Sequence, residues 1–346
     1  MKRIILFIIS AALYSCSEDE SLPTEPSSDD KFGEIRALPE VDVKNSASGR
    51  LGVGKYYTVS NNWSASDWTK TGDFDGDGDD DIGSIYFNQV LMKLSNGENV
   101  NYASNETWNT DGIYTTGDWT FSGDFNGDGF ADIVSLSGSQ ALIKLNNQSK
   151  GFNSTVWSVS NQWGGAGWTV VGDFDGDGDD DIASANGTRI FLKKSFRTGF
   201  SSHTYYTDGL YSGGGGWTFA CDYNADGLDD IVSINGDKIY VKQSNVTSGG
   251  NFDGFSSYTH LTSNLWSGSP LFTWVGDTDG DGRDEVLTAI GDKIYVREWS
   301  GTNNWSRVTK GTNNIWAGNG WEWAMDYTGD GTAEVVSALG SQLFLH

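Results

Sequence analysis

Residues 168–182 read WTVVGDFDGDGDDDI, and this stretch decides the fold. A short apolar segment leads into a nine-residue acidic loop, residues 173–181, which has glycines at its fourth and sixth positions. A second apolar segment begins at Ile182. Short apolar segments on either side of a glycine-containing turn are typical of β-strands. The stretch therefore predicts a β-hairpin whose turn carries the acids.

The same pattern occurs six times in the chain. The acidic loops are residues 73–81, 124–132, 173–181, 222–230, 277–285 and 326–334, and their first positions are separated by 51, 49, 49, 55 and 49 residues. An aromatic residue precedes each loop by five positions, and a basic residue follows each first position by twenty. The two columns are Trp68, Trp119, Trp168, Trp217, Phe272 and Trp321, and Lys93, Lys144, Lys193, Lys242, Arg297 and His346. Repeats of about fifty residues with four short strands each are typical of propeller blades.

We therefore predict an all-β fold, a single β-propeller of six four-stranded blades over residues 49–346. The last repeat ends at His346 on its third strand, so it lacks a fourth. Residues 55–63 match fourth strands such as residues 202–211. We expect this N-terminal segment to complete the last blade and close the ring without an open edge. Six motifs fit six blades better than seven.

Each acidic loop has the oxygen atoms that a hard cation needs. Side chains at positions 1, 3, 5 and 9 should converge, position 7 should offer its carbonyl, and Gly at position 6 should permit the sharp turn. Position 12 is Ser or Thr, so the acid at position 9 must close the site in place of the Glu of an EF-hand. Oxygen ligands without His or Cys favour Ca²⁺ over zinc or Mg²⁺. Without a cation, the acids of one loop would repel one another.

The sequence thus predicts up to six structural Ca²⁺ ions, with the sixth site weakest because Thr328 replaces an acid. Close to half of the 47 acidic residues stand at four positions of these loops. The predicted ligands are Asp73, Asp75, Asp77, Asp79 and Asp81; Asp124, Asn126, Asp128, Phe130 and Asp132; Asp173, Asp175, Asp177, Asp179 and Asp181; Asp222, Asn224, Asp226, Leu228 and Asp230; Asp277, Asp279, Asp281, Arg283 and Glu285; and Asp326, Thr328, Asp330, Thr332 and Glu334.

These loops, with the preceding Trp-Thr pair and the following Ile or Val, resemble the FG-GAP (VCBS) repeats of the integrin α-chain propeller. Over roughly residues 51–346 the chain is also similar to integrin-like propeller lectins from fungi. The resemblance implies calcium hairpins on one face of the ring and the loops between blades on the opposite face. It implies no single function, because such blades serve adhesion, lectin and enzyme proteins.

The loops between blades carry a second aromatic column beside Asn and Ser residues: Trp63, Tyr114, Trp163, Tyr211, Trp266 and Trp316. An aromatic face beside amides and hydroxyls suits a neutral sugar, because the ring packs on C–H groups and the polar groups bind hydroxyls. Six such sites would add avidity on a polysaccharide. Packing between blades is an equal alternative for this column. For the first column, Trp68 and its equivalents, we expect packing alone.

Three functions fit the sequence. The first is lectin-like binding of neutral glycans, the second a protein adhesion or assembly scaffold, and the third a polysaccharide lyase. The lyase is the weakest, because the chain has only His203, His260 and His346 and no nucleophile elbow or His-rich cluster. No catalytic or cofactor-binding residue is predicted besides the metal ligands. A net charge of −25 argues against nucleic acid as a partner.

The N-terminal region indicates targeting. Lys2 and Arg3 precede an apolar run that ends just before Cys16, so residues 1–15 resemble a lipoprotein signal peptide with Cys16 as the lipidated residue. Residues 16–48 are acidic and proline-containing and predict a tether. Residues 17–20 (SEDE) are similar to the export tag of Bacteroidetes surface lipoproteins.

That resemblance implies an outer-membrane lipoprotein exposed on the cell surface, in contact with the membrane through its lipid only, with a glycan or a surface protein as partner. With Cys16 lipidated, Cys221 has no cysteine left for an intramolecular disulfide.

Overall fold

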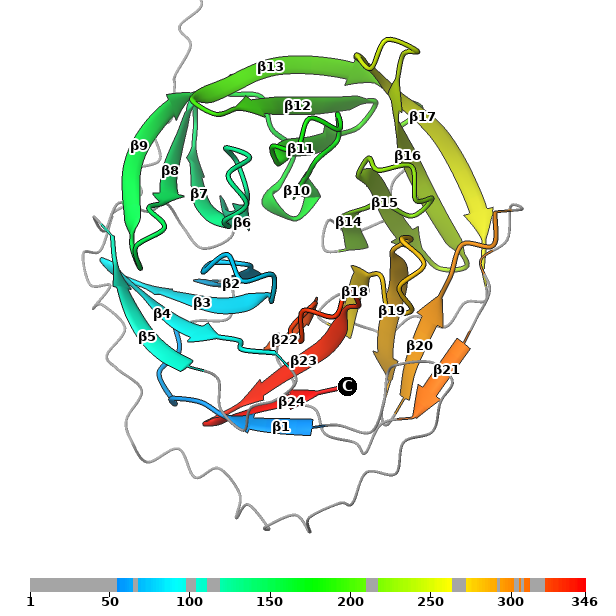
Figure 1. Ribbon diagram of the computed structural model, residues 1–346. Helices are drawn as coiled ribbons and strands as arrows, with labels where there is room; N and C mark the ends of the chain where they lie inside the picture. The colour runs from blue at the N-terminus through cyan, green and yellow to red at the C-terminus, as the bar shows by residue number, and fades with distance from the viewer. Residues whose placement is uncertain are drawn as a thin grey trace, which may run out of the picture. The chain divides into compact units, whose positions relative to one another are not determined.

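The computed structural model describes residues 55–64, 68–97, 104–110, 119–209, 217–262, 272–290, 293–301, 305, 308–311 and 321–346. These residues form six four-stranded antiparallel sheets arranged as the blades of a ring (Figure 1). The predicted six-bladed propeller is therefore confirmed. All described residues belong to the unit Ser46–His346. The predicted signal peptide, Cys16 and the tether lie outside the described residues.

The blades follow one another in chain order. Blade 1 contains β2 (Thr69–Gly72), β3 (Asp81–Tyr86), β4 (Gln89–Leu94) and β5 (Ser104–Asn109). Blade 2 contains β6 (Thr120–Gly123), β7 (Asp132–Ser137), β8 (Gln140–Asn146) and β9 (Phe152–Ser158). Blade 3 contains β10 (Thr169–Gly172), β11 (Asp181–Asn186), β12 (Arg189–Phe196) and β13 (Gly199–Tyr206), preceded by the 3-10 turn η3 (Ala166–Trp168).

The other three blades repeat this order. Blade 4 contains β14 (Thr218–Cys221), β15 (Asp230–Asn235), β16 (Lys238–Val246) and β17 (Phe252–Leu261). Blade 5 contains β18 (Thr273–Gly276), β19 (Glu285–Ile290), β20 (Lys293–Arg297) and β21 (Val308–Gly311). Blade 6 contains β22 (Glu322–Met325), β23 (Glu334–Leu339), β24 (Gln342–Leu345) and β1 (Lys55–Thr58).

The N-terminal strand completes the last blade. Strand β1 pairs antiparallel with β24, with Lys55 opposite Leu345 and Thr58 opposite Gln342. Figure 1 shows the two strands side by side although they lie at opposite ends of the described chain. This confirms the predicted closure of the ring, in which blade 6 takes its fourth strand from the N-terminal side.

The two hairpins of each blade place different turns at opposite ends of its inner strands. In blade 3, Gly172 pairs with Asp181, so the acidic loop joins β10 to β11. At the other end of β11, Asn186 pairs with Arg189 across a two-residue turn. Gly187 in that turn has φ +58°, as the tight turn of a two-residue hairpin requires. The acidic loops and the two-residue turns therefore lie at opposite ends of the strands.

The hydrophobic core lies between neighbouring blades. Phe74 and Trp108 of blade 1 pack with Ile133 and Phe152 of blade 2 in one buried cluster. Five consecutive residues of β11 are buried, because each blade is covered by neighbours on both faces. Trp68 packs against the blade 1 cluster, as expected of the first aromatic column. The thiol of Cys221 is buried and free. Among the described residues, no helix is long and apolar enough to cross a membrane.

Candidate functional site

Each acidic loop wraps around the carboxylate of its first residue. In the third loop, Asp173 accepts the backbone N–H groups of Gly176 (2.7 Å), Asp177 (3.2 Å) and Gly178 (3.0 Å). The glycine at position 6 has φ between +81° and +94° in all six loops, a conformation that favours glycine. In every loop the N–H of the seventh residue donates to the carboxylate of the fifth, at 2.9–3.1 Å. Ligation by the carbonyl of the seventh residue stays a prediction.

Carboxylates converge inside the loops of blades 1, 3 and 5. In blade 5 all four predicted side chains meet, with one oxygen of each within 4.8 Å of the others. The three groups are Asp277, Asp279, Asp281 and Glu285; Asp73, Asp75 and Asp81; and Asp173, Asp175 and Asp177. In the other three loops the third position holds Asn126, Asn224 or Thr328, which carry no charge. The acidic clusters have the composition and spacing to bind metal ions.

Buried oxygen atoms test whether a cation fits these loops. Among the described residues, five loop oxygens are buried without a hydrogen-bond partner: Asp75 Oδ1, Asn126 Oδ1, Asp175 Oδ1, Asp181 Oδ2 and Glu334 Oε2. All five belong to position 3 or position 9. Leaving a buried polar group unpaired costs about 1–3 kcal/mol, more for a charged one. A cation ligated by these oxygens would remove that cost, so the loops fit a hard metal ion.

Burial also disfavours the charged form of the ninth-position carboxyl groups. Loss of solvent, reinforced by the charge of Asp75, raises the pKa of Asp81 to about 9. Loss of solvent, reinforced by the charge of Asp175, raises the pKa of Asp181 to about 9, and burial raises that of Glu285 to about 8. Both causes act because the site concentrates negative charge away from water, and a bound cation opposes both.

In the third loop a lysine side chain pairs with one oxygen of the Asp175 carboxylate, whose other oxygen, Oδ1, is the one without a partner. The ammonium group of Lys194 forms an ion pair with Asp175. The equivalent residues in blades 1 and 2 are Leu94 and Leu145, which carry no charge. The third loop therefore attracts a cation even within its own blade.

The eighth loop residue, which the sequence analysis did not single out, joins neighbouring loops. Asp229 accepts the backbone N–H of Asp173 at 3.0 Å, and its own N–H donates to the carbonyl of Asp173 at 2.9 Å. The same reciprocal pair links Asp180 to Asp124, Asp284 to Asp222 and Asp80 to Asp326. In blades 2 and 6 the residue is alanine, and only the backbone bond is present. The only sequence signal was the doubled acid at positions 8 and 9.

The second aromatic column is described at Trp63 and Trp163, and both are half-buried between blades. Each indole N–H donates to the turn of the preceding blade, Trp63 to Gly340 (2.9 Å) and Trp163 to Gly138 (3.0 Å). The buried ammonium of Lys193 lies 4.3 Å from the Trp163 ring centroid and donates to the carbonyl of Gln162 at 2.9 Å. These two rings therefore pack, and sugar contact by the column stays a prediction. Tyr114, Tyr211, Trp266 and Trp316 lie outside the described residues.

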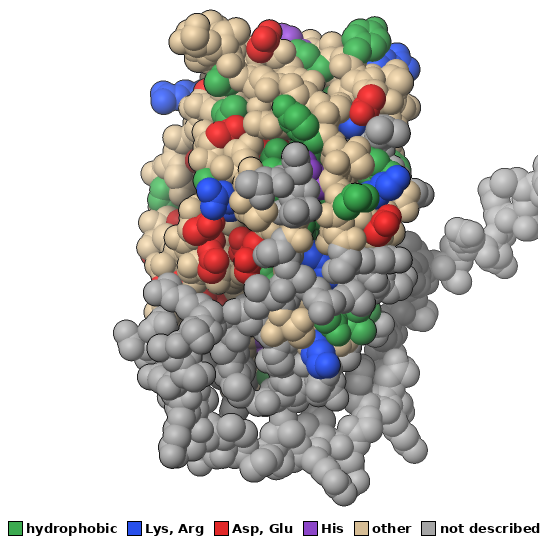
Figure 2. Space-filling model, turned by 90° about the vertical axis from the view of Figure 1, so that its right-hand side faces the viewer, with side chains coloured by type: hydrophobic (Ala, Val, Ile, Leu, Met, Phe, Trp, Pro, Cys, Tyr) green, Lys and Arg blue, Asp and Glu red, His purple; other side chains and the backbone are tan. Residues whose placement is uncertain are grey.

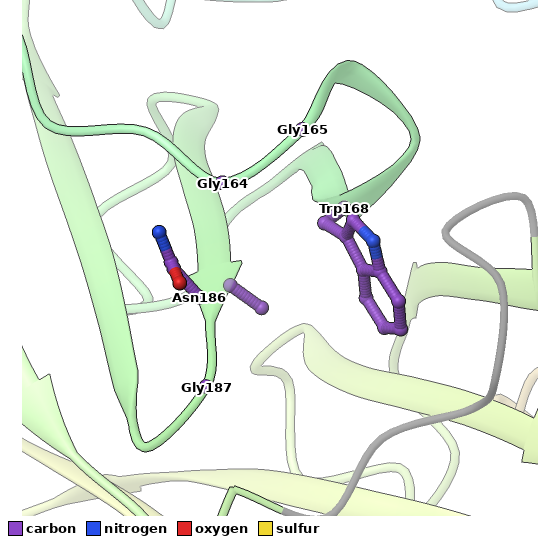
Figure 3. A pocket seen from close by; sticks show the side chains of 6 residues that line it. Gly164, Gly165, Trp168, Asn186 and Gly187 are labelled. Atoms are coloured by element: carbon purple, nitrogen blue, oxygen red, sulfur yellow. The ribbon is translucent and has the colours of Figure 1, made fainter.

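A pocket of about 300 Å³ lies beside this column in blade 3 (Figure 3). Its lining consists of Gly164, Gly165, Trp168, Ala185, Asn186 and Gly187. In Figure 3 the Trp168 indole lies on one side of the strand that carries Asn186, and the Asn186 amide points to the other side, where it donates to the Trp163 carbonyl at 3.4 Å. A Cβ at Gly164 would come within 2.0 Å of the Ala185 carbonyl oxygen, so only glycine lets the loop approach this closely. Trp168, expected to serve packing alone, thus also lines a pocket.

The pocket is not the same in every blade. At the place of Asn186 the other blades carry Tyr86, Ser137, Asn235, Ile290 and Leu339. Blades 3 and 4 alone have an amide there. The six repeats therefore do not form six equivalent sites at this position.

One region of the propeller surface is strongly acidic. Figure 2 shows Asp and Glu side chains gathered toward the left of the view. Loop positions such as Asp77, Asp128 and Asp226 are exposed and contribute to the acidic surface of the ring.

Comparisons with known proteins agree with this geometry. Residues 124–184 match the family described as FG-GAP-like repeat. The search of curated proteins found no match to the chain. Among solved structures, the chain is similar to a Tc holotoxin pore of Photorhabdus luminescens, with 14% identity and a TM-score of 0.58 over 85% of this chain. The chain spans only 14% of that protein.

A second similar structure is a lectin of Agrocybe aegerita, described for its recognition of non-reducing terminal N-acetylglucosamine. It has 22% identity and a TM-score of 0.50, over 78% of this chain and 73% of the lectin. At this identity the two structures establish the propeller fold alone. The class of protein that the fold defines is a six-bladed β-propeller, and residues 124–184 of it match the FG-GAP-like repeat.

Proposed function

We propose that the chain is a calcium-stabilised propeller that binds neutral glycans. The observation that carries the proposal is the blade 3 pocket, whose glycine-rich lining includes both the Trp168 ring and the Asn186 side chain. An aromatic ring packs on the C–H face of a sugar, and an amide both donates to and accepts from hydroxyl groups. None of the described residues that line the pocket is cationic, which suits an uncharged ligand. The similarity to a lectin that recognises N-acetylglucosamine supports the same class of ligand.

The test is binding of the chain to an array of neutral glycans that includes terminal N-acetylglucosamine. The variant Asn186→Ala/Asn235→Ala removes both amides at this register and should weaken retention at least tenfold, which corresponds to about 1.4 kcal/mol. Asn153→Ala, an exposed change on the outer strand β9, is the matched control and should bind as the parent does. Retention on no glycan in the presence of calcium would overturn the proposal.

We also propose that Ca²⁺ is the ion of the acidic loops and that its role is structural. The loops offer only oxygen ligands, and five of their buried oxygens have no other partner among the described residues. Calcium would be held by the side chains at positions 1, 3, 5 and 9, and it would neutralise the loop and fix the hairpin. The loops lie at the opposite end of the strands from the glycan pocket, so the ion supports that pocket through the blade.

For location, we propose that Cys16 carries lipid and anchors the propeller at the outer surface of an outer membrane, on the tether of residues 16–48. The proposal comes from the sequence alone. Incorporation of labelled fatty acid into the chain, lost in Cys16→Ser, would support it. Release of the propeller by protease from intact cells would support exposure, whereas protection from protease would exclude it.

A further inference from the structure

In blades 1, 2 and 3, aromatic rings pack against an aromatic ring of the blade that follows. Each contains the second residue of the acidic loop, a ring from the fourth strand of the same blade, and a ring from the next blade. The three sets are Phe74, Trp108 and Phe152; Phe125, Trp157 and Phe200; and Phe174, Tyr205 and Phe255. The only polar atoms of these three sets are the indole nitrogens of Trp108 and Trp157 and the hydroxyl of Tyr205. All the other rings are phenylalanines. They fill the space between blades.

Blade 4 departs from this pattern. The corresponding rings are Tyr223, His260 and, from blade 5, Trp305, and every one carries a polar atom; Trp299, at the place of Asn146, Ser195 and Ser244, adds a fourth ring against Tyr223 and His260. The His260 ring lies 4.3 Å from the ring of Trp299, and Tyr223 lies 5.6 Å from it, between centroids. Beside them a pocket of about 370 Å³ opens, within the size range of small-molecule sites. Asn224, Asp226, Gln243 and Tyr258 complete its lining.

His260 is the group in this pocket that has a polar atom in need of a partner. Its side chain is 4% exposed, and its Nε2 has no hydrogen-bond partner among the described residues. Burial lowers the pKa of His260, so the imidazole is neutral near pH 7 and each ring nitrogen either donates or accepts. In blade 3 the same register position holds Tyr205, and in blade 2 it holds Trp157. Among blades 2, 3 and 4, only blade 4 has a histidine at this register.

The rest of the lining indicates what would pair with that nitrogen. Tyr258 is 44% exposed and stacks on His260 at 6.2 Å, which leaves an aromatic face open to a ligand. Gln243 offers an amide, and its Nε2 reaches Asp226 at 3.4 Å. Asp226 is the one charged residue among the described residues of the lining, and it already accepts the N–H of Leu228 at 3.1 Å in the acidic loop. A ligand with hydroxyl groups and an apolar face satisfies these groups, whereas a quaternary ammonium ion, which has no N–H group, would leave the His260 nitrogen unpaired.

We propose that the pocket between blades 4 and 5 is a separate binding site for one neutral pyranose sugar. The sugar would stack on Tyr258, and its hydroxyl groups would hydrogen-bond to His260 Nε2 and Gln243. The ligand class rests on the proposed function, but the site shares no residue with the pocket of blade 3. It lies at the end of the blade that carries the acidic loop, as Asn224 and Asp226 show.

The experiment uses the histidine signals of the full chain in NMR, because there are only three histidines. His260→Tyr introduces the residue of blade 3 and identifies the His260 resonance by its loss. Titration with N-acetylglucosamine and with methyl glycosides of glucose and galactose should shift the His260 resonance saturably and leave that of His203 in place. Gln243→Leu/Tyr258→Thr, which introduces residues found at these registers in blade 2, should weaken the binding seen at His260 at least tenfold.

The same titration separates this site from the blade 3 pocket. In Asn186→Ala/Asn235→Ala the His260 shift should persist even where array binding is lost. Absence of any His260 shift up to about 50 mM sugar, far above the millimolar Kd of a weak single-sugar site, would overturn the inference while array binding still tests the proposed function. A saturable shift with tetramethylammonium and none with the sugars would also overturn it.

Discussion

At the scale of single residues, Phe87 stands where the other described two-residue turns have glycine. Its φ is +51°, close to the +57° to +63° of Gly138, Gly187, Gly236 and Gly340. A side chain in this left-handed region costs about 1–2 kcal/mol. The Phe87 ring is 73% exposed, so its hydrophobic burial offsets little of that cost. We expect Phe87→Gly to raise the free energy of unfolding by about 1 kcal/mol in urea titrations. Gly187→Ala, the reverse change, should lower it, and a destabilised Phe87→Gly would contradict the argument.

The buried lysine column has a consequence for the dependence of stability on pH. Burial lowers the pKa of Lys193 from 10.5 to about 8. Between these two values the folded chain has lost a proton that the unfolded chain keeps, so stability rises with pH there. We expect the unfolding free energy of the parent, relative to Lys193→Met, to increase from pH 7.5 to pH 9.5.

Urea titrations of both proteins at the two pH values, with calcium at a fixed saturating concentration, measure this difference. Subtracting the variant removes the contribution of every other titrating group. A constant difference would mean that the cation–π contact with Trp163 and the hydrogen bond to Gln162 fully compensate the burial of the charge.

At the scale of structural elements, the acidic loops are joined through their eighth residues. Asp229→Ala removes the carboxylate that accepts the Asp173 N–H and makes blade 4 like blades 2 and 6, where alanine occupies this place. An unpaired buried N–H costs about 1–3 kcal/mol, and the Asp173 N–H is only partly buried, so we expect a loss of about 1 kcal/mol in the free energy of unfolding. Asp237→Ala, in the exposed two-residue turn of the same blade, serves as the control. Equal stability of both variants would show that the backbone bond alone holds the loops together.

The repeat period made the strands and hairpins predictable, whereas the contacts between repeats were not. Gly172 and Asp181 pair as the acidic turn requires, because spacing along one hairpin determines that register. The bond from Asp229 to Asp173 joins residues that are 56 positions apart, and no local pattern indicates it. The same holds for Lys194 and Asp175, which meet only because β12 passes beside the loop.

At the scale of the whole molecule, six acidic loops are distributed around one closed ring. If calcium fills them, each site contributes RT ln(1 + [Ca²⁺]/Kd), about 2.7 kcal/mol when calcium is at 100 times Kd. We expect a chelator to lower the melting temperature by several degrees or more and added calcium to restore it, measured by scanning calorimetry. Magnesium at the same concentration should restore less, because its octahedral geometry fits these loops poorly. An unchanged melting temperature would refute the structural role of the ion.

Ring closure was predictable from counting, because the last repeat ends one strand short and the N-terminal segment matches the missing strand. The candidate sugar sites were predictable only in part. The sequence indicated aromatic residues between blades, but the two described members of that column, Trp63 and Trp163, have their indole N–H groups bonded to neighbouring turns. The ring that lines the blade 3 pocket is Trp168, from the column expected to pack.

The sequence by itself determined the repeat, the blade count and the oxygen-rich loops, because each of these depends on residues close together in the chain. Only the tertiary structure decided which loop oxygens are buried without partners, which aromatic rings pack, and where pockets open. Those properties depend on the neighbouring blade. His260 illustrates the difference: its position in a fourth strand followed from the repeat, but its unpaired nitrogen beside Trp299 exists only because blade 5 packs against blade 4.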